Sequence, residues 1–483
     1  MAEAPRFTVR EVELYERPVV LRLPFRFGVV TLTECPQAFV RARIEFADGR
    51  GAWGAAAEMM APKWFDKNLA LSNEDNFDQL RDVLRLAREA YLADLTPASA
   101  FSHFARNYDA YMAAAAARRF NPLLASYGPA LIDRAVLDAL CRLQGVSFYQ
   151  AMTANLPGVG AARPEFNGLD IERFLAGLAP RPSIAARHTV GLLDAITASD
   201  LTQRVNDGLP ETLEEVIHVY GHRHFKLKVS GNVQADLARL QAIAAVLDRS
   251  AEPYFASLDG NEQYEDAQGI AQLVDGIRGR TELTRLWESV LFIEQPIARK
   301  PALDEDLRKA DLGKPVIIDE SDGELDTFLA ARERGYTGVS SKTCKGLYKS
   351  VLNAARCAAW NSECGETRYF MSAEDLTTQA GLSVQQDLAL VNLLGIEHVE
   401  RNGHHYVNGM AAQPQAEQDA FLAAHPDVYE RSHGAVRLKI RDGKIELGSL
   451  ACPGYASAAM PGFSAMQAIG PLAVRTEPGN RSG

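Results

Sequence analysis

The sequence has no apolar run long enough to span a membrane as a helix. Its first residues, MAEAPRFTVREVELY, have no apolar core after a basic start, as an export signal would. We therefore expect no membrane partner, no export signal and a cytoplasmic location.

Motifs for nucleotides, zinc and nucleic acids are also lacking. There is no G-x-G-x-x-G and no P-loop. The cysteines form no C-x-x-C pair, which argues against both a zinc knuckle and a disulfide framework. A formal net charge of -11 argues against a nucleic-acid partner. With 483 residues, of which 47% are hydrophobic and 23% charged, the chain can bury the cores of two globular domains.

What the sequence does contain is a series of short apolar runs that end in charged residues: FKLKV, ASLDGNE, LFIEQP, VIIDES and VSSKTCKG. The charged residues are Lys226, Lys228, Asp259, Glu294, Asp319, Glu320 and Lys342. Segments with helical periodicity, such as ADLARLQAIAAVLDRS, lie between the runs. Alternating strands and helices of this kind predict parallel strands, and at this length a closed eight-fold TIM-type barrel.

The charged residues fall at the carboxyl ends of the predicted strands, where barrels carry their functional side chains. Carboxylates from three neighbouring strands form an all-oxygen, negatively charged cage that suits Mg²⁺ or Mn²⁺. A lysine close to such a cation and to a second ammonium is driven toward its neutral form, in which it acts as a general base. Together these groups suit removal of the proton alpha to a carboxylate through an enediolate.

In their order along the chain these motifs resemble the muconate-lactonizing-enzyme-like (mandelate racemase/muconate lactonizing enzyme) branch of the enolase superfamily. The resemblance implies a (β/α)7β barrel with an α+β capping domain, and Mg²⁺ or Mn²⁺ as cofactor. It implies metal ligands at Asp259, Glu294 and Asp319, and catalytic lysines at Lys226, Lys228 and Lys342. Behind the ligands we expect Glu320, Asn261 and Glu374 as supporting residues.

The predicted domains are a capping domain over residues 1–160, a barrel over 187–408 and a carboxy-terminal segment, 409–483, that returns to the cap. The segment YGPALIDRAVLDALCRLQGVSFYQAM resembles the last cap helix of the family, and a helical insertion precedes it at about 63–126. In AVRLKIRDGKIELGS the Asp-Gly pair predicts a hairpin.

Substrate contacts beyond the carboxylate are expected from the cap, and the candidates are Phe25, Phe27, Lys63 and Trp64. Packing within the cap is an equal alternative for the aromatic residues. On the barrel rim, Arg401 is a candidate for a second substrate anion, with an exposed loop arginine as the alternative, and either His404 or His405 is a candidate site residue. His222 and His224 are interpreted as packing inside the barrel.

The pattern of lysines favours a racemase, epimerase or cycloisomerase acting on a small carboxylate, in a homo-oligomer. Dipeptide epimerisation is disfavoured because EHVERNGHHYVNG lacks the D-x-D motif of those enzymes. Two alternatives stay open: a dehydratase of acid sugars or other carboxylates, and a catalytically inactive barrel that acts as a binding protein.

Overall fold

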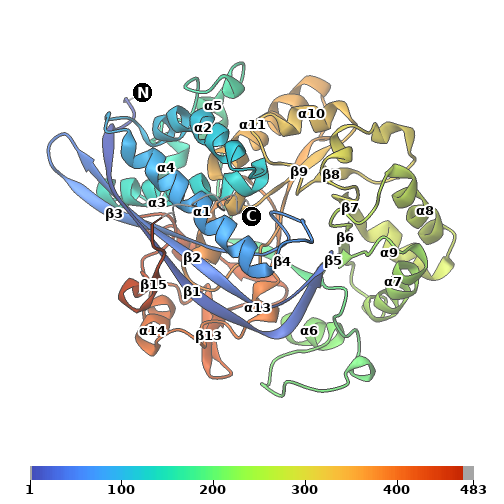
Figure 1. Ribbon diagram of the computed structural model, residues 1–483. Helices are drawn as coiled ribbons and strands as arrows, with labels where there is room; N and C mark the ends of the chain where they lie inside the picture. Colours follow the sequence, from blue (N-terminus) through green and yellow to red (C-terminus); the bar gives the residue numbers. More distant parts are fainter. Residues whose placement is uncertain (1–2, 472–483) are drawn as a thin grey trace, which may run out of the picture.

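The structure is a computed structural model that describes residues 3–471 of the chain. It begins with a capping domain whose antiparallel sheet has the strand order β15-β1-β2-β3. The long strands β1 (Phe7–Phe27) and β2 (Val30–Phe46) form a hairpin, and β3 (Gly51–Met59) pairs with β2. Sheet and barrel lie side by side in Figure 1.

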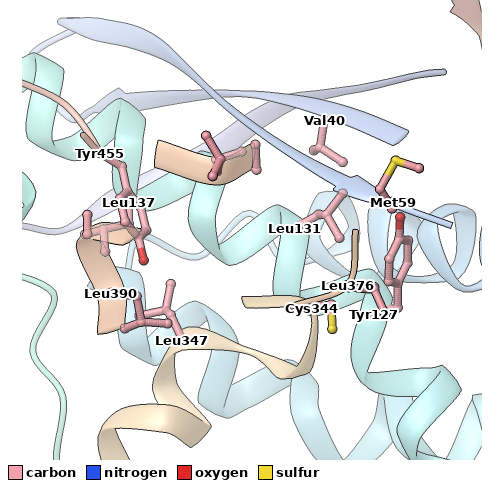
Figure 2. Close-up of a cluster of buried hydrophobic side chains, with 14 of the residues drawn as sticks. Val40, Met59, Tyr127, Leu131, Leu137, Cys344, Leu347, Leu376, Leu390 and Tyr455 are labelled. Atoms are coloured by element: carbon pink, nitrogen blue, oxygen red, sulfur yellow. The ribbon is translucent and has the colours of Figure 1, made fainter. Parts of the chain in front are cut away.

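Four helices follow the sheet: α1 (Asn73–Ala93), α2 (Ala100–Ala117), α3 (Pro122–Gln144) and α4 (Phe148–Thr153). The sequence limits α3 clearly, because Asn121 caps its first turn, Pro122 opens it and Gly145 ends it with a positive φ. Almost the whole circumference of α3 is buried, because the cap sheet and the barrel both pack on it. Figure 2 shows this shared core, in which Leu131 of the helix lies near Met59 of the sheet and Leu347 comes from the barrel.

The barrel has eight parallel strands in sequence order, and pairing of its last strand with its first closes it. The strands are β4 (Ser183–Val190), β5 (His224–Lys228), β6 (Phe255–Asp259), β7 (Val290–Glu294), β8 (Val316–Ile318), β9 (Gly338–Ser341), β10 (Phe370–Ala373) and β11 (His398–Glu400). The predicted fold class is therefore confirmed. The first barrel strand begins at Ser183, slightly before the predicted start at residue 187.

Helices surround the barrel (Figure 1). After the short α5 (Ile171–Ala176) they are α6 (Leu213–Tyr220), α7 (Val233–Leu247), α8 (Ala267–Arg278), α9 (Thr284–Ser289), α10 (Thr327–Glu333), α11 (Leu347–Cys364), α12 (Leu382–Leu393) and α13 (Gly403–Tyr406). A further helix, α14 (Gln415–Ala424), packs within the carboxy-terminal segment. Within residues 3–471, no helix is both long enough and apolar enough to cross a membrane.

The carboxy-terminal segment contacts both domains. Its strands are β12 (Tyr429–Ser432), β13 (Ala435–Leu438), β14 (Lys444–Glu446) and β15 (Gln467–Ala468). A turn forms at the predicted Asp-Gly pair, but the two strands beside it do not pair with each other as predicted. Strand β13 pairs with β12, and β14 pairs with barrel strand β4. β15 pairs with β1 of the cap, and residues 472–483 lie outside the described part.

A buried ion pair within the cap is hydrogen-bonded to the barrel beside a predicted catalytic lysine. Glu58 of β3 accepts hydrogen bonds from the guanidinium of Arg134 in α3 at 3.2 Å and from the hydroxyl of Thr343 at 2.9 Å. Thr343 directly follows Lys342. The contact therefore fixes the chain next to Lys342 against the cap.

We expect Glu58→Ala to lower the free energy of unfolding by about 3–5 kcal/mol, because it leaves the fully buried Arg134 without its charged partner. Denaturant unfolding at pH 8 measures this, since burial raises the pKa of Glu58 only to about 7 and the carboxylate is then ionised. The control Glu45→Ala breaks partly exposed pairs with Arg10 and Arg43 and should cost less than about 1 kcal/mol. Equal costs for the two variants would contradict the role given to Glu58.

Candidate active site

Three carboxylates lie side by side at the carboxyl end of the barrel. Asp259 ends β6 and pairs in register with Glu294, which ends β7, while Asp319 directly follows β8. All three are fully buried. Because parallel strands end at the same edge of the barrel, residues far apart in sequence meet in one group.

The ammonium of Lys226 lies among four carboxylates. Its Nζ is 2.8 Å from Asp259, 2.9 Å from Glu294, 2.6 Å from Glu374 and 3.1 Å from Glu400. Lys226 is itself only 1% exposed. The lysine thus provides positive charge at the centre of the site.

Lys228 and Lys342 belong to opposite sides of the barrel. Lys228 ends β5 and contacts Asp259 at 2.6 Å, and Lys342 follows β9 and contacts Asp319 at 2.7 Å. In the closed eight-stranded order, β5 and β9 are four strands apart in either direction. The two lysines therefore face one another across the barrel, and β6, β7 and β8 lie between them.

A small cavity opens between the barrel end and the cap. Lys226, Lys228 and Lys342 line it, with further lining from Phe25, Phe27, Ala61, Trp64, Asn261, Asp375, Leu376, Thr377, Glu400 and Asn402. The ammonium of Lys342 lies 4.2 Å from the centre of the Trp64 ring, in a cation–π contact. The indole Nε1 of Trp64 is buried and has no hydrogen-bond partner in the described part of the chain. It is a free donor in the wall of the cavity.

The ion pairs of the site connect equal numbers of cations and carboxylates. The six cations are Arg187, Lys226, Lys228, Lys342, Lys345 and Lys349, and the six carboxylates are Asp259, Glu294, Asp319, Asp322, Glu374 and Glu400. The site is thus close to neutral as it stands. A divalent cation added to it would leave an excess of positive charge.

A model of the family described as "Enolase C-terminal domain-like" matches residues 208–456, which is just over half of the chain. The chain belongs to the enolase superfamily. This confirms the resemblance predicted from the motifs, and the protein is an enzyme of that superfamily. No curated protein matches its sequence.

Solved structures with the same fold as this enolase-superfamily enzyme include three instructive ones. An enolase from Streptomyces coelicolor matches with a TM-score of 0.59 and 14% identity, over 94% of each chain. A muconate lactonizing enzyme from Pseudomonas fluorescens, complexed with muconolactone, matches with a TM-score of 0.57 and 18% identity. The match covers 94% of this chain and 97% of that one. A dipeptide epimerase from Enterococcus faecalis, complexed with Mg and a dipeptide, matches with a TM-score of 0.58 and 14% identity. The match covers 93% of this chain and 99% of that one.

The network shifts the pKa values of its members in opposite directions. For Lys226, burial alone would lower the pKa, but the four surrounding carboxylates raise it well above the usual value. Burial and the neighbouring Asp259 and Glu374 raise the pKa of Glu294 well above its usual value. For Glu374, burial is outweighed by Arg187 and Lys226, which hold the pKa at about 2. The negative charge of Glu294 is therefore poorly compensated by neighbouring cations, whereas that of Glu374 is well compensated.

Superfamily membership implies a divalent metal, and the residues present fit one. Asp259, Glu294 and Asp319 offer only carboxylate oxygens, the ligands that Mg²⁺ prefers. The Oε2 atom of Glu294 is buried and accepts no hydrogen bond from the described residues, and its one cationic neighbour among the ion pairs is the Lys226 ammonium at 2.9 Å, which it shares with three other carboxylates. A cation between the three carboxylates would satisfy that oxygen and supply the charge that Glu294 lacks.

The predicted supporting residues lie next to these carboxylates. The backbone N–H of Asn261 donates to Asp259 at 2.8 Å, and its side-chain amide donates to Glu320 at 3.1 Å. Glu374 contacts Lys226 and also pairs with Arg187. These contacts orient the groups that face the cavity.

Three of the predicted substrate contacts do not line the cavity in this structure, and their role in binding stays a prediction. The ammonium of Lys63 donates to the backbone carbonyls of Asn68 and Leu71 instead of facing the cavity. Arg401 is buried, not exposed, and its guanidinium pairs with Asp375 and Asp387. Among the described residues that line the cavity, neither His404 nor His405 is found. Phe25, Phe27 and Trp64 do line it.

Two residues at the site were not predicted. Glu400 ends the last barrel strand, lines the cavity and contacts Lys226. Its sequence signal was weak, because the segment EHVE that ends in this carboxylate contains only one apolar residue, Val399. Lys67 of the cap lies 2.6 Å from Glu262 and 3.7 Å from Glu320, and no local pattern marks it.

We expect Lys226→Met to destabilise the chelator-treated protein by about 3–5 kcal/mol, because it leaves buried carboxylates without their shared cation. Added Mg²⁺ should restore part of the loss. Denaturant unfolding with and without Mg²⁺ measures both effects. The exposed Lys300 provides a control, and Lys300→Met should change stability by less than about 0.5 kcal/mol. An unchanged unfolding midpoint for Lys226→Met would refute the role of its ammonium.

Proposed function

We propose that the protein is a Mg²⁺-dependent isomerase that removes and returns the proton alpha to the carboxylate of a small substrate. The observation that carries the proposal is the opposition of Lys228 and Lys342 across one cavity, with three carboxylates on the strands between them. Two bases on opposite faces of one carbon suit racemisation, epimerisation or cycloisomerisation. An elimination would instead need one such base together with an acid that protonates the leaving hydroxyl group.

Asp259, Glu294 and Asp319 are the proposed metal ligands. When bound there, Mg²⁺ would supply positive charge to the substrate carboxylate as the enediolate forms. Lys226 keeps its proton, because its four carboxylate neighbours raise its pKa, and it adds a fixed positive charge to the same group. Glu320, Asn261 and Glu374 orient these residues.

Lys228 and Lys342 are the proposed acid and base. In the structure each ammonium is paired with a carboxylate assigned to the metal, Lys228 with Asp259 and Lys342 with Asp319. For Lys342, burial lowers the pKa but Asp319 outweighs it and raises the pKa. Once the carboxylate charge is neutralised, burial and the excess positive charge both favour a neutral lysine, which is the form that accepts a proton.

The cap supplies the proposed selectivity. Phe25, Phe27 and Trp64 give the cavity an apolar part of its lining, so a small carboxylate with an apolar substituent fits best. The free Nε1–H of Trp64 is available for one substrate acceptor. The small size of the cavity excludes a large substrate unless the cap opens.

A screen of carboxylates in D₂O with Mg²⁺ tests the function. We expect deuterium to enter the carbon alpha to the carboxylate, with product of inverted or cyclised structure and no loss of water. Uptake with loss of water would identify a dehydratase instead. No uptake from any carboxylate would identify a binding protein and overturn the proposal.

Lys228→Ala and Lys342→Ala should each lower turnover by about 10²–10⁴-fold, because each removes a positioned acid or base. Mg²⁺ affinity, measured by calorimetry, should persist in both. The matched variant Asp259→Asn should lose metal and activity together. Full activity of Asp259→Asn in the presence of a chelator would contradict the metal assignment, and full activity of either lysine variant would contradict the acid–base assignment.

We expect Trp64→Phe to lower kcat/KM for the preferred substrate by about 10-fold or more, because it removes a hydrogen-bond donor and part of the cavity wall. The remaining ring keeps an aromatic contact for Lys342, and Mg²⁺ affinity should stay unchanged. Phe65→Leu is the control, since Phe65 packs behind Trp64 against Tyr127. It should lower stability without changing the order of substrate preference. The same order of preference in Trp64→Phe would show that Trp64 is only a packing residue.

A further inference from the structure

A second group of potential ligands lies on the outer side of the barrel. His188 of β4 lies between Arg187, which contacts Glu374, and Thr189, which contacts Glu400. Because side chains alternate along a strand, His188 points away from the barrel interior. It belongs to none of the contacts described above for the catalytic cavity.

Two more histidines meet His188 there. His222 lies just before β5, and His404 belongs to the short helix α13. The ring centroids are 5.4 Å apart for His188 and His222, 5.6 Å for His222 and His404, and 6.1 Å for His188 and His404. One nitrogen from each ring lies within 4.8 Å of the other two. This corrects the interpretation of His222 as packing inside the barrel, whereas His224 does stack on His398.

Ring nitrogens of this cluster lack partners. Nδ1 of His188 and Nε2 of His222 are buried and make no hydrogen bond to any described residue, and the His404 ring has only a weakly aligned interaction with the backbone of Arg401. Buried polar atoms normally have a partner, so each of these is exceptional. Unpartnered buried atoms occur elsewhere in the described chain as well, but here those of neighbouring imidazole rings lie together.

His222 is arranged as metal-bound histidines usually are. Its Nδ1 lies 2.9 Å from the backbone carbonyl oxygen of Ala186 and donates to it. That bond fixes the tautomer and leaves the lone pair of Nε2 free. Burial also lowers the pKa of all three histidines, to about 4 for His222, so the rings are neutral as ligands must be.

We propose that His188, His222 and His404 bind one zinc ion at a site separate from the carboxylate centre. Imidazole nitrogens suit zinc, whereas the carboxylates suit Mg²⁺, so the two sites differ in selectivity. Zinc with bonds of about 2.0–2.1 Å holds tetrahedral ligands about 3.4 Å apart, so the rings need to approach one another by about 1 Å. A water molecule or a small anion takes the fourth position.

The zinc ion would join three segments that also carry catalytic groups. His188 is next to Thr189, which bonds Glu400, His222 is four residues before Lys226, and His404 is two residues after Asn402 of the cavity wall. Bound zinc would therefore fix β4, the start of β5 and the segment after β11 to each other, although its open fourth position differs from a closed four-ligand site. Zinc should raise the melting temperature without being needed for proton transfer.

Calorimetric titration of the chelator-treated enzyme with Zn²⁺, in saturating Mg²⁺, tests the proposal. We expect one zinc per chain, and an affinity at least 10-fold weaker in both His222→Gln and His404→Gln. His224→Gln and Asp259→Asn serve as controls and should bind zinc like the native chain. Absence of zinc binding at micromolar concentrations would overturn the proposal. So would loss of zinc binding in Asp259→Asn but not in His222→Gln, because the zinc would then occupy the carboxylate centre.

X-ray absorption of the zinc-loaded native chain gives a test that needs no folded variant. We expect about three imidazole nitrogens at about 2.0 Å from the zinc. A shell of oxygen ligands alone would overturn the assignment. Because this measurement does not involve substrate, it tests the zinc site independently of the proposed isomerase activity.

Discussion

The ammonium of Lys226 is the contact on which the active site depends. Several carboxylates from different strands can be buried together only if a cation compensates them, because an unpaired buried charge costs several kcal/mol. Lys226 meets four of them, and Lys228 and Lys342 each take one carboxylate of the proposed metal centre. The barrel can therefore fold before any metal binds, with the lysines as provisional counter-ions for the groups assigned to the metal.

Closure of the barrel turns this charge balance into a mechanism. Eight strands in sequence order place β5 opposite β9, so Lys228 and Lys342 approach one cavity from two sides, with Asp259, Glu294 and Asp319 between them. The cap completes the cavity with Phe25, Phe27 and Trp64. Glu58, which is paired with Arg134 inside the cap, accepts the hydrogen bond of Thr343 that ties the cap to the chain beside Lys342. A metal that neutralises the carboxylates would release both lysines for proton transfer in our proposal.

Much of the fold and of this centre was predictable, because strand ends carry a local signal. A short apolar run followed by Lys, Asp or Glu marks a strand and its catalytic end together, and parallel strands bring such ends to one edge. Contacts that depend on distant segments leave no such mark. Arg401 looked like a loop residue, but Asp375 and Asp387 neutralise it in the interior. Lys63 and Lys67 are near neighbours in sequence, yet only Lys67 reaches Glu320. The Asp-Gly turn formed as predicted, but the strands on its two sides pair with the distant strands β12 and β4 instead of with each other.

A crystal of the protein soaked in Mn²⁺ tests the central claim most directly, because anomalous scattering locates the metal and the same map shows the lysines. The account predicts one Mn²⁺ within about 2.3 Å of carboxylate oxygens of Asp259, Glu294 and Asp319. It also predicts that the ammonium groups of Lys228 and Lys342 leave these carboxylates and point into the cavity. A metal bound elsewhere, or lysines still paired with Asp259 and Asp319 beside a bound metal, would contradict it.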